Sequence, residues 1–527
     1  MGRLTCELHR PGMTALHRVG LAGLYMTLDA FDRDPDSAAE LNAAGLSWRL
    51  DERKVELEFA EDHEREAVEK LLELAFQIDN RGFFRFPGIE RNGAATIEQK
   101  CLLYQALLGT FLQHGQTRST DKTKKGLLVV EIDDKRIRLP DFAPIVSYSH
   151  QRASKDLLKQ KGVLTEKITV VGSLYPGGAQ RHTASGFAAT CLEEPTELAF
   201  CLLFAPVGSI FFQLSSHRVG RKARTALVLP QVLSLSRYAR LRRFVAKSGV
   251  LALTAASPTD AALHLAVMAK GQELAESLGG ILRVMAFGIV DWNEKQKSRT
   301  AAYAVNLAAL PGMRNYERAS RIFKSRWQHV DAKTDRKGNI KEPAYDFVRP
   351  FTAREIIADN IASRRPWYAG FAEYLTNRET RIPLQFERKE LFQMTQEADY
   401  DHPSERVLIE TCHEAWRRRL GQLGDRARRE HASFNRLASG EYEKQRSSFA
   451  RCKNGATLRA ALTDFWSRAG SLTSLQANWA AILPLLEEDQ WRKARDLALL
   501  ALASYQPSTA DEQEALTENT TADQQGQ

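Results

Sequence analysis

Apolar residues recur along the N-terminal part of the chain with the spacing of helices and of one hairpin. Residues 14–30, 62–78 and 95–115 bring apolar side chains together on a helical period, which predicts three helices. Residues 46–50 and 54–59 alternate apolar and polar side chains around a charged turn, which predicts a β-hairpin. We therefore expect an α/β segment at residues 1–116.

The middle of the chain has the pattern of a sheet with helices on it. Helices are expected at 236–247 and 260–278, and strands at 126–132, 167–172, 197–205, 209–215, 225–232, 281–290 and 300–307. The connections between these elements are polar and basic. We expect a mixed sheet region at residues 117–313, with basic loops held at the edges of a rigid scaffold.

Strand signals nearly vanish after about residue 315. Helices are expected at 315–330, 352–364 and 367–379, and six more helical segments follow Met394, as in a bundle. The expected domains are a helical connector at 314–393, a helical bundle at 394–505 and a disordered acidic tail at 506–527. The fold class is expected to be α+β: a mixed N-terminal α/β region with basic loops, then an all-helical C-terminal bundle.

The net charge of +9 is unevenly distributed over the 527 residues. Residues 1–80 hold 17 acidic and 9 basic residues, and residues 508–527 hold five acidic residues and no basic one. By contrast, Leu198 to Thr259 holds nine basic residues and no Asp or Glu. Because charges of one sign repel each other, a solvated surface normally mixes both signs. This acid-free stretch indicates a polyanionic partner; a basic face without a partner is the alternative.

The sequence contains no familiar catalytic motif. It has no Walker-type phosphate loop, no G-x-G-x-x-G, no H-E-x-x-H and no G-x-S-x-G, and its six cysteines form no C-x-x-C pair. No apolar run approaches the roughly 20 residues that span a bilayer. We therefore expect a reduced, cytoplasmic, non-catalytic protein with no membrane, cofactor or metal site. An enzyme acting on nucleic acid, with metal-binding carboxylates scattered along the chain, stays open as an alternative.

Two glycine-bearing or polar loops carry side chains suited to reading DNA. The segment GSLYPGGAQRHTASG follows a strand-like run, and its glycines permit close backbone approach to a ligand. The segment DWNEKQKSR has the pattern of a hairpin tip. Amide side chains suit base edges, and Arg and Lys suit guanine or phosphate. The candidate motif-reading residues are Gly177, Gly178, Gln180, Arg181, His182, Asn293, Lys295, Gln296, Lys297 and Arg299. For either loop, an ordinary solvated turn is the alternative.

Three basic clusters are candidates for contacts with a phosphate backbone. They lie in the loop DKTKKG, in the acid-free stretch and in an arginine-rich helix of the C-terminal bundle. The candidate residues are Lys122, Lys124, Lys125, Arg218, Arg221, Lys222, Arg224, Arg240, Arg242, Arg243, Arg417, Arg418, Arg426 and Arg429. The alternatives are an ordinary loop for the first cluster and, for the last, a solvated helix face balanced by nearby Glu.

Two motifs resemble a known family. PGMTALHRVGLAGLYMTL at residues 11–28 and YPGGAQRHTA at residues 175–184 resemble the large subunit of type I CRISPR Cascade complexes, in particular the Myxan subtype related to type I-B. The layout of the chain is also similar to the family along nearly its whole length. The resemblance implies a non-catalytic subunit of an antiviral surveillance complex, because a separate helicase-nuclease cuts the DNA in this family.

The same resemblance implies partners and a role. The partners would be guide RNA, double-stranded target DNA with its displaced strand, the Cascade backbone and foot subunits, a small subunit, and a helicase-nuclease or a transposition adaptor. The chain would recognise a protospacer-adjacent motif, help to unwind the duplex and stabilise the R-loop. A scaffold for a transposition machine is a further alternative.

The resemblance also implies that the bundle at 394–505 is similar to a small subunit, which could come from the same gene. In related genes it is translated from an internal start, and Met394 stands just before the helical run, so the product would have 134 residues. We expect a second, shorter band in a western blot of a C-terminal tag, abolished by Met394→Leu. A single band that this substitution leaves unchanged would identify Met394 as an ordinary core residue.

Overall fold

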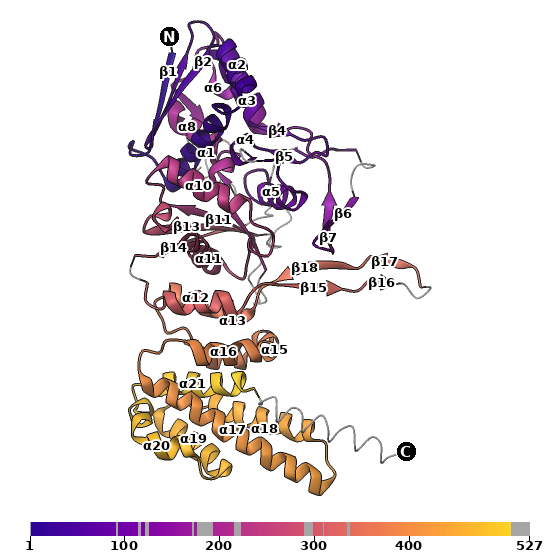
Figure 1. Ribbon diagram of the computed structural model, residues 1–527, viewed down its shortest axis with the longest axis vertical. Coiled ribbons are helices and arrows are strands. Elements are labelled where there is room, and N and C mark those ends of the chain that lie inside the picture. The colour runs from indigo at the N-terminus through magenta and orange to yellow at the C-terminus, as the bar shows by residue number, and fades with distance from the viewer. Residues whose placement is uncertain are drawn as a thin grey trace, which may run out of the picture. The chain divides into compact units, whose positions relative to one another are not determined.

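The computed structural model describes residues 2–90, 93–113, 117–121, 126–170, 173–176, 193–215, 223–288, 299–308, 310–334 and 338–506. These residues form two compact units. The first unit holds the described residues up to 308 together with 325–350, and the second holds 310–324 and 351–506. Many of the elements of both units are labelled in Figure 1.

The first unit begins with a three-stranded antiparallel sheet and the helices that cover it. The strand order is β1 (Gly2–Glu7), β3 (Lys54–Phe59), β2 (Leu46–Leu50). The helices α1 (Ala15–Phe31), α2 (Pro35–Ala43) and α3 (Glu64–Ala75) follow the predicted order. Helix α1 is buried along almost its whole length, which explains why its sequence is apolar on nearly every face.

Helix α1 packs directly against the backbone of α8 (Thr196–Leu203) and α9 (Ala205–Gly208). A β-carbon on Gly20 would collide with the carbonyl of Cys201, and one on Gly23 would collide with the carbonyl of Phe204. On the other side of the contact, a β-carbon on Gly208 would collide with the carbonyl of Val19. Glycine is therefore required at three positions of this contact, two of which belong to the motif at residues 11–28.

A five-stranded sheet forms the middle of the first unit. Its order is β12 (Thr254–Ala255), β10 (Ile210–Leu214), β11 (Ala223–Pro230), β13 (Ile281–Gly288), β14 (Arg299–Asn306). Strand β12 runs parallel to β10, and the other neighbouring pairs are antiparallel. The helices α10 (Leu235–Ala246) and α11 (Pro258–Gly271) pack on the sheet, and their inward residues complete an apolar core.

A further, four-stranded sheet of the first unit has the order β15 (Arg326–Val330), β18 (Tyr345–Arg349), β7 (Lys135–Phe142), β6 (Gly126–Ile132). The strands β16 (Lys333–Thr334) and β17 (Ile340–Glu342) continue β15 and β18 as a two-stranded ribbon (Figure 1). The smaller elements are β4 (Gln77–Ile78), β5 (Phe84–Arg85), α4 (Pro87–Glu90), α5 (Ile97–Gly109), α6 (Ser154–Leu157), β8 (Lys167–Thr169), β9 (Glu193–Pro195) and two 3-10 turns at 149–152 and 275–278.

The second unit is helical throughout its described residues. It comprises α12 (Met313–Ile322), α13 (Thr352–Ala362), α14 (Phe371–Thr376), α15 (Arg378–Gln385), α16 (Arg388–Glu397), α17 (Pro403–Glu430), α18 (Phe434–Ala450), α19 (Gly455–Ala469), α20 (Thr473–Ile482), a 3-10 turn at 483–486 and α21 (Trp491–Ser504). Helix α21 lies at the centre, against α14, α16, α17 and α18. Its Asp496 accepts hydrogen bonds from the amides of Gly370 and Ala372 at 2.7 and 3.0 Å.

The expected α+β class is confirmed, and two element predictions are wrong. Residues 197–203 lie in helix α8 and Ala205 begins α9, rather than forming a strand, because this apolar run is buried on all sides and has no period that separates the two structures. Residues 315–330 are not one helix: α12 ends at Ile322 and β15 occupies 326–330. Strands β15 to β18 therefore occur after residue 315. Charged residues in them interrupt the alternation of apolar and polar positions that would have predicted strands from the sequence. No helix among the described residues is long and apolar enough to cross a membrane.

The glycine contact of α1 yields a prediction about stability. We expect Gly23→Ala to lower the free energy of unfolding by about 1–3 kcal/mol, because the added methyl group overpacks a backbone contact. Gly421→Ala is the matched control, since Gly421 also lies within a helix but has nothing within 4 Å of an added β-carbon. That control is expected to gain about 0.5–1 kcal/mol. Urea unfolding measures both values, and equal stability of Gly23→Ala and wild type would refute the close contact.

Candidate nucleic-acid interface

Two polar connections, the first of them basic, leave the five-stranded sheet at the same end. In the register, Gln213 of β10 pairs with Thr225 of β11, and Ala223 of β11 pairs with Gly288 of β13. Gly288 in turn pairs with Arg299 of β14. The connection from β10 to β11 and the connection from β13 to β14 therefore begin and end at one end of four neighbouring strands. The predicted hairpin strands around DWNEKQKSR are confirmed by this pairing.

Most of the predicted reading residues are carried by these connections or by the loop after Pro176. Lys122, Lys124, Lys125, Gly177, Gly178, Gln180, Arg181, His182, Arg218, Arg221, Lys222, Asn293, Lys295, Gln296 and Lys297 lie outside the described residues. Arg224 is exposed at the start of β11, and the backbone of Arg299 opens β14. The described strands thus bring together the stems of two predicted loops, and the contacts of the loop side chains stay predictions.

The stem of the loop that carries Gln180 and Arg181 is closed by a polar contact. Strands β8 and β9 pair across the stem, with Ile168 opposite Glu194. The hydroxyl of Tyr175 donates a hydrogen bond to Oε1 of Glu194 at 3.2 Å. Burial and the neighbouring Glu194 carboxylate raise the pKa of Tyr175, so its hydroxyl keeps the proton that it donates.

His17 of α1 completes this closure. Its Nδ1 accepts a hydrogen bond from the backbone amide of Thr14 at 3.2 Å, within the capping box that starts the helix. Nε2 lies 3.6 Å from Oε1 of Glu194, and the ring stands edge-on to Tyr175 at 6.1 Å between centroids.

The two motifs that resemble the Cascade family therefore meet in space at Glu194. Thr14 and His17 come from the first motif and Tyr175 from the second. Sequence reasoning did not identify Glu194, because an acidic residue before Pro195 has the pattern of an ordinary loop. Neither did it connect His17 with Tyr175, since 157 residues of sequence separate them and only the fold joins them.

The prediction that Arg242 and Arg243 bind phosphate at the surface is corrected by their burial. They are 4% and 5% exposed, because α10 turns this face toward α1 and α4. Arg243 forms an ion pair with Asp29 at 2.7 Å and donates to the carbonyl oxygens of Gly88 and Met26. Nε of Arg242 donates to the carbonyl oxygen of Val207 at 3.1 Å. Arg240 of the same helix is exposed and stays a candidate.

In the second unit, α17 carries the predicted arginine cluster. Arg418 pairs with Glu414 at 2.9 Å and Arg426 with Glu430 at 3.0 Å, each one helical turn away. Arg417 and Arg429 are exposed. The paired carboxylates reduce the positive charge of this face, which favours the interpretation of a solvated helix over a strand-binding one. Met394, the candidate internal start, is buried in α16.

Among the described residues, no group of three or more His, Cys, Asp or Glu side chains is placed to hold a metal ion. Five cysteines, Cys6, Cys101, Cys201, Cys412 and Cys452, are buried as free thiols. Burial raises the pKa of Cys101 and of Cys412 to about 12, so these thiols are held in the unreactive protonated form.

Two family models match this chain. The DevT N-terminal domain matches residues 5–203, which contain both motifs and the Glu194 closure, and the DevT C-terminal domain matches residues 396–527. These two matches define the class, a protein built of DevT domains. The CRISPR-associated protein Cas8a1/Csx13 of Myxococcus xanthus (strain DK1622) is 30% identical over 524 residues, covering 95% of this chain and 88% of the relative. The chain belongs to the Cas8a1/Csx13 family of CRISPR-associated proteins, and the resemblance to type I Cascade large subunits is confirmed.

The α17–α20 contact of the second unit gives a prediction about pH. Burial opposes the ionisation of Glu414, but hydrogen bonds from Ser474 and Thr473 and the Arg418 guanidinium lower its pKa to about 2. The pKa in the unfolded chain is near 4.5, so the stabilisation is fully present above that pH and is lost as the pH falls toward 2.

We expect Glu414→Gln to lower the free energy of unfolding at pH 7 by about 1–3 kcal/mol, the usual range for hydrogen bonds to a charged group. The difference from wild type should shrink between pH 4.5 and pH 2. Glu410→Gln is the matched control, because Glu410 forms an exposed pair with Arg406 and should matter by less than about 1 kcal/mol. Urea unfolding across this pH range checks the result, and a pH-independent difference would contradict it.

Proposed function

We propose that this chain is the non-catalytic large subunit of an RNA-guided Cascade surveillance complex and reads the protospacer-adjacent motif in duplex DNA. The observation that carries the proposal is the departure of two polar connections, the first of them basic, from one end of a rigid sheet. Their sequences combine Asn and Gln, which suit base edges, with Arg and Lys, which suit guanine or phosphate. A rigid frame that anchors both connections at one end suits the recognition of a short duplex motif.

The loop after Pro176 has a different role in the proposed function. Its stem is held by the hydrogen bond between Tyr175 and Glu194, and the ring of His17 packs edge-on against Tyr175. Glycines at 177 and 178 permit the backbone to approach a base pair closely. We assign this loop to opening the duplex beside the motif, and we assign the connections of the five-stranded sheet to reading it.

The proposed partners follow from the division of labour in RNA-guided recognition. Guide pairing supplies the long sequence specificity, while the protein reads a short motif and backbone shape, as described for a different effector class. The chain would bind guide RNA, the target duplex and its displaced strand, and would stabilise the R-loop. Its protein partners would be the backbone and foot subunits, a small subunit, and a helicase-nuclease or a transposition adaptor.

The test is a mobility shift of the reconstituted guide complex, with and without this chain, on target duplexes with randomised flanks. We expect tight binding to require the chain and to select a short flank. Asn293→Ala should relax the flank choice by about 1–3 kcal/mol per base contacted, or roughly five- to 150-fold. Gln272→Ala, an exposed amide of the same unit, is the matched control and should change nothing.

Two further variants separate the loops. Gln180→Ala should weaken binding to closed duplexes more than binding to duplexes that are already unpaired beside the flank. Tyr175→Phe removes the hydrogen bond to Glu194 but keeps the ring, so it should resemble Gln180→Ala while costing only about 1 kcal/mol of stability. If the chain has no influence on flank choice, the proposal fails. Metal-dependent cleavage of DNA by the isolated chain would then favour the enzyme alternative.

A further inference from the structure

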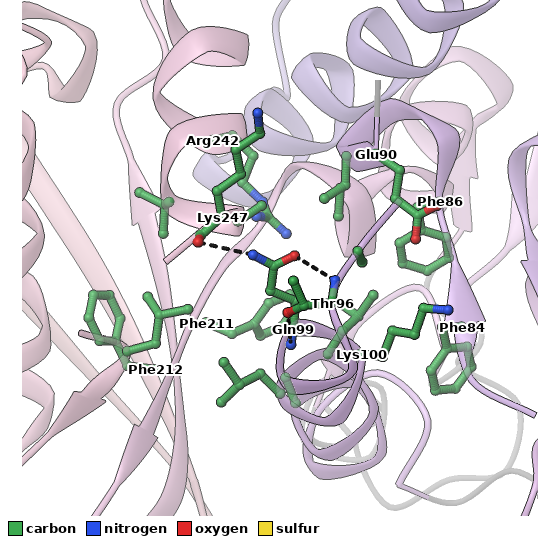
Figure 2. A pocket seen from close by; sticks show the side chains of 18 of the residues that line it. Phe84, Phe86, Glu90, Thr96, Gln99, Lys100, Phe211, Phe212, Arg242 and Lys247 are labelled. Carbon is green, nitrogen blue, oxygen red and sulfur yellow. Dashed lines mark hydrogen bonds between the residues drawn. The ribbon is translucent and has the colours of Figure 1, made fainter. Parts of the chain in front are cut away.

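A cavity of about 300 Å³ lies in the first unit, between α5, β10 and the end of α10 (Figure 2). Its walls are mostly apolar and include Phe84, Phe86, Leu103 and Phe211. The volume is at the lower end of the range for pockets that bind small ligands. None of the site residues discussed above lines this cavity apart from Arg242, so the proposed motif reading does not account for it.

Arg242 gives the cavity an unusual electrostatic character. Its side chain is 4% exposed and lines the cavity, yet among the described residues its only hydrogen bond joins Nε to the Val207 carbonyl oxygen. Burial lowers the pKa of this guanidinium to about 10, and the one neighbouring group that acts on it is the phenol of Tyr238. The adjacent Arg243 shows the contrast, because Asp29 neutralises it at 2.7 Å. A buried guanidinium without a carboxylate is costly unless a ligand supplies the acceptor.

The other charged groups of the cavity are already paired, except at the mouth. Lys100 is held by Asp79 at 2.8 Å, and Glu90 is held by Arg85 at 3.2 Å. Lys247 is exposed, and it lines both this cavity and an adjoining hollow that contains Arg240. A ligand that enters would therefore meet positive charge at the rim and one unsatisfied donor group inside.

The frame of the cavity is rigid. Gln99 joins its two sides: its Nε2 donates to the carbonyl oxygen of Lys247 at 3.0 Å, and its Oε1 accepts from the amide of Thr96 at 3.0 Å. Figure 2 shows both bonds, with Arg242 beside Gln99. The ring of Phe211 is half-buried, and it is supported from behind by Phe111 in an edge-on contact at 6.5 Å between centroids. An aromatic face and a fixed donor thus converge on one space.

We propose that this cavity binds an unstacked guanine nucleotide. The base would lie against Phe211 with the O6 and N7 acceptors on Arg242, and the phosphate would lie at Lys247. Guanine fits best because a guanidinium only donates, and O6 and N7 form the one purine edge that presents two acceptors to it. Apolar walls with a few polar groups are the usual receptor for a base taken out of its stack.

The nucleotide could be free or part of a strand, and the experiment separates these sources. The strand-bound form rests on the proposed function, whereas the free form does not. Purified full-length protein is titrated calorimetrically with guanosine 5′-monophosphate, guanosine and ribose 5-phosphate. In parallel, fluorescence anisotropy compares a labelled hexamer containing one guanosine among uridines with an all-uridine hexamer.

We expect guanosine 5′-monophosphate to bind at least tenfold more tightly than ribose 5-phosphate, and the guanosine hexamer more tightly than the uridine hexamer if the site takes a strand. Leu103→Trp fills the cavity without changing its charge and should lower guanosine affinity at least tenfold. Arg242→Met should do the same. Lys247→Ala should weaken the monophosphate and leave guanosine unchanged. Arg237→Ala, which removes an exposed arginine of the same helix that pairs with Glu276, is the matched control and should bind as wild type does.

Equal binding of guanosine 5′-monophosphate and ribose 5-phosphate would overturn the proposal, because it would show attraction of an anion to the rim alone. Unchanged guanosine binding by Leu103→Trp would overturn it as well, and this variant decides the matter if Arg242→Met does not fold. If nucleotides fail to bind while assembly of the complex shields a Leu103→Cys thiol, the cavity is a protein-docking site and the proposal is wrong. If the wild-type chain does not bind guanosine while the complex still selects its flank, this proposal is wrong and the proposed function stands.

Discussion

Helix α1 approaches the backbone of α8 and α9 so closely that only glycine can occupy the contact, and much of the first unit is positioned by this restriction. Gly20 and Gly23 lie against the carbonyls of Cys201 and Phe204, and Gly208 lies against that of Val19. The segment held in this way leads directly into β10, the strand from which the first connection departs. It is preceded by Glu194, which the same contact brings beside His17. One close contact therefore positions the stem of the loop after Pro176. The same contact positions β10, the strand from which the connection to β11 departs.

The acid-free stretch serves two physical purposes in the folded chain. Part of its positive charge is internal: Arg243 is neutralised by Asp29, a residue of α1, and Arg242 faces a cavity. Another part, Arg224 and Arg240, is exposed on the same unit. An absence of Asp and Glu between residues 198 and 259 was therefore a sound indication of an unusual charge environment. It could not separate the arginines that hold helices together from those that are free to meet a polyanion.

Local pattern was sufficient for most elements, and it failed where tertiary context decides. Alternation identified β10, β11, β13 and β14, and with them the hairpin whose tip carries Asn293. It misassigned residues 197–205, because an apolar run that is buried all round looks the same as a helix or as an interior strand. It missed β15 to β18, whose ribbon is largely polar.

Of the candidate site, the loop residues could be proposed from their chemistry, but the closure by Tyr175, Glu194 and His17 depends on three segments that only the fold brings together. The family resemblance added the biological role that these patterns alone leave open.

The five-stranded sheet also sets the distance between the points where the two connections leave it. The first connection is rooted between β10 and β11 and the second between β13 and β14, so their roots are two strand spacings apart. Neighbouring strands lie about 4.8 Å apart, which places the roots about 10 Å from each other. Successive bases of one DNA strand rise about 3.4 Å, so this interval corresponds to about three base steps. Hydrogen-bonded strands resist stretching, so the sheet fixes this interval between the roots of the two connections that we propose read the motif.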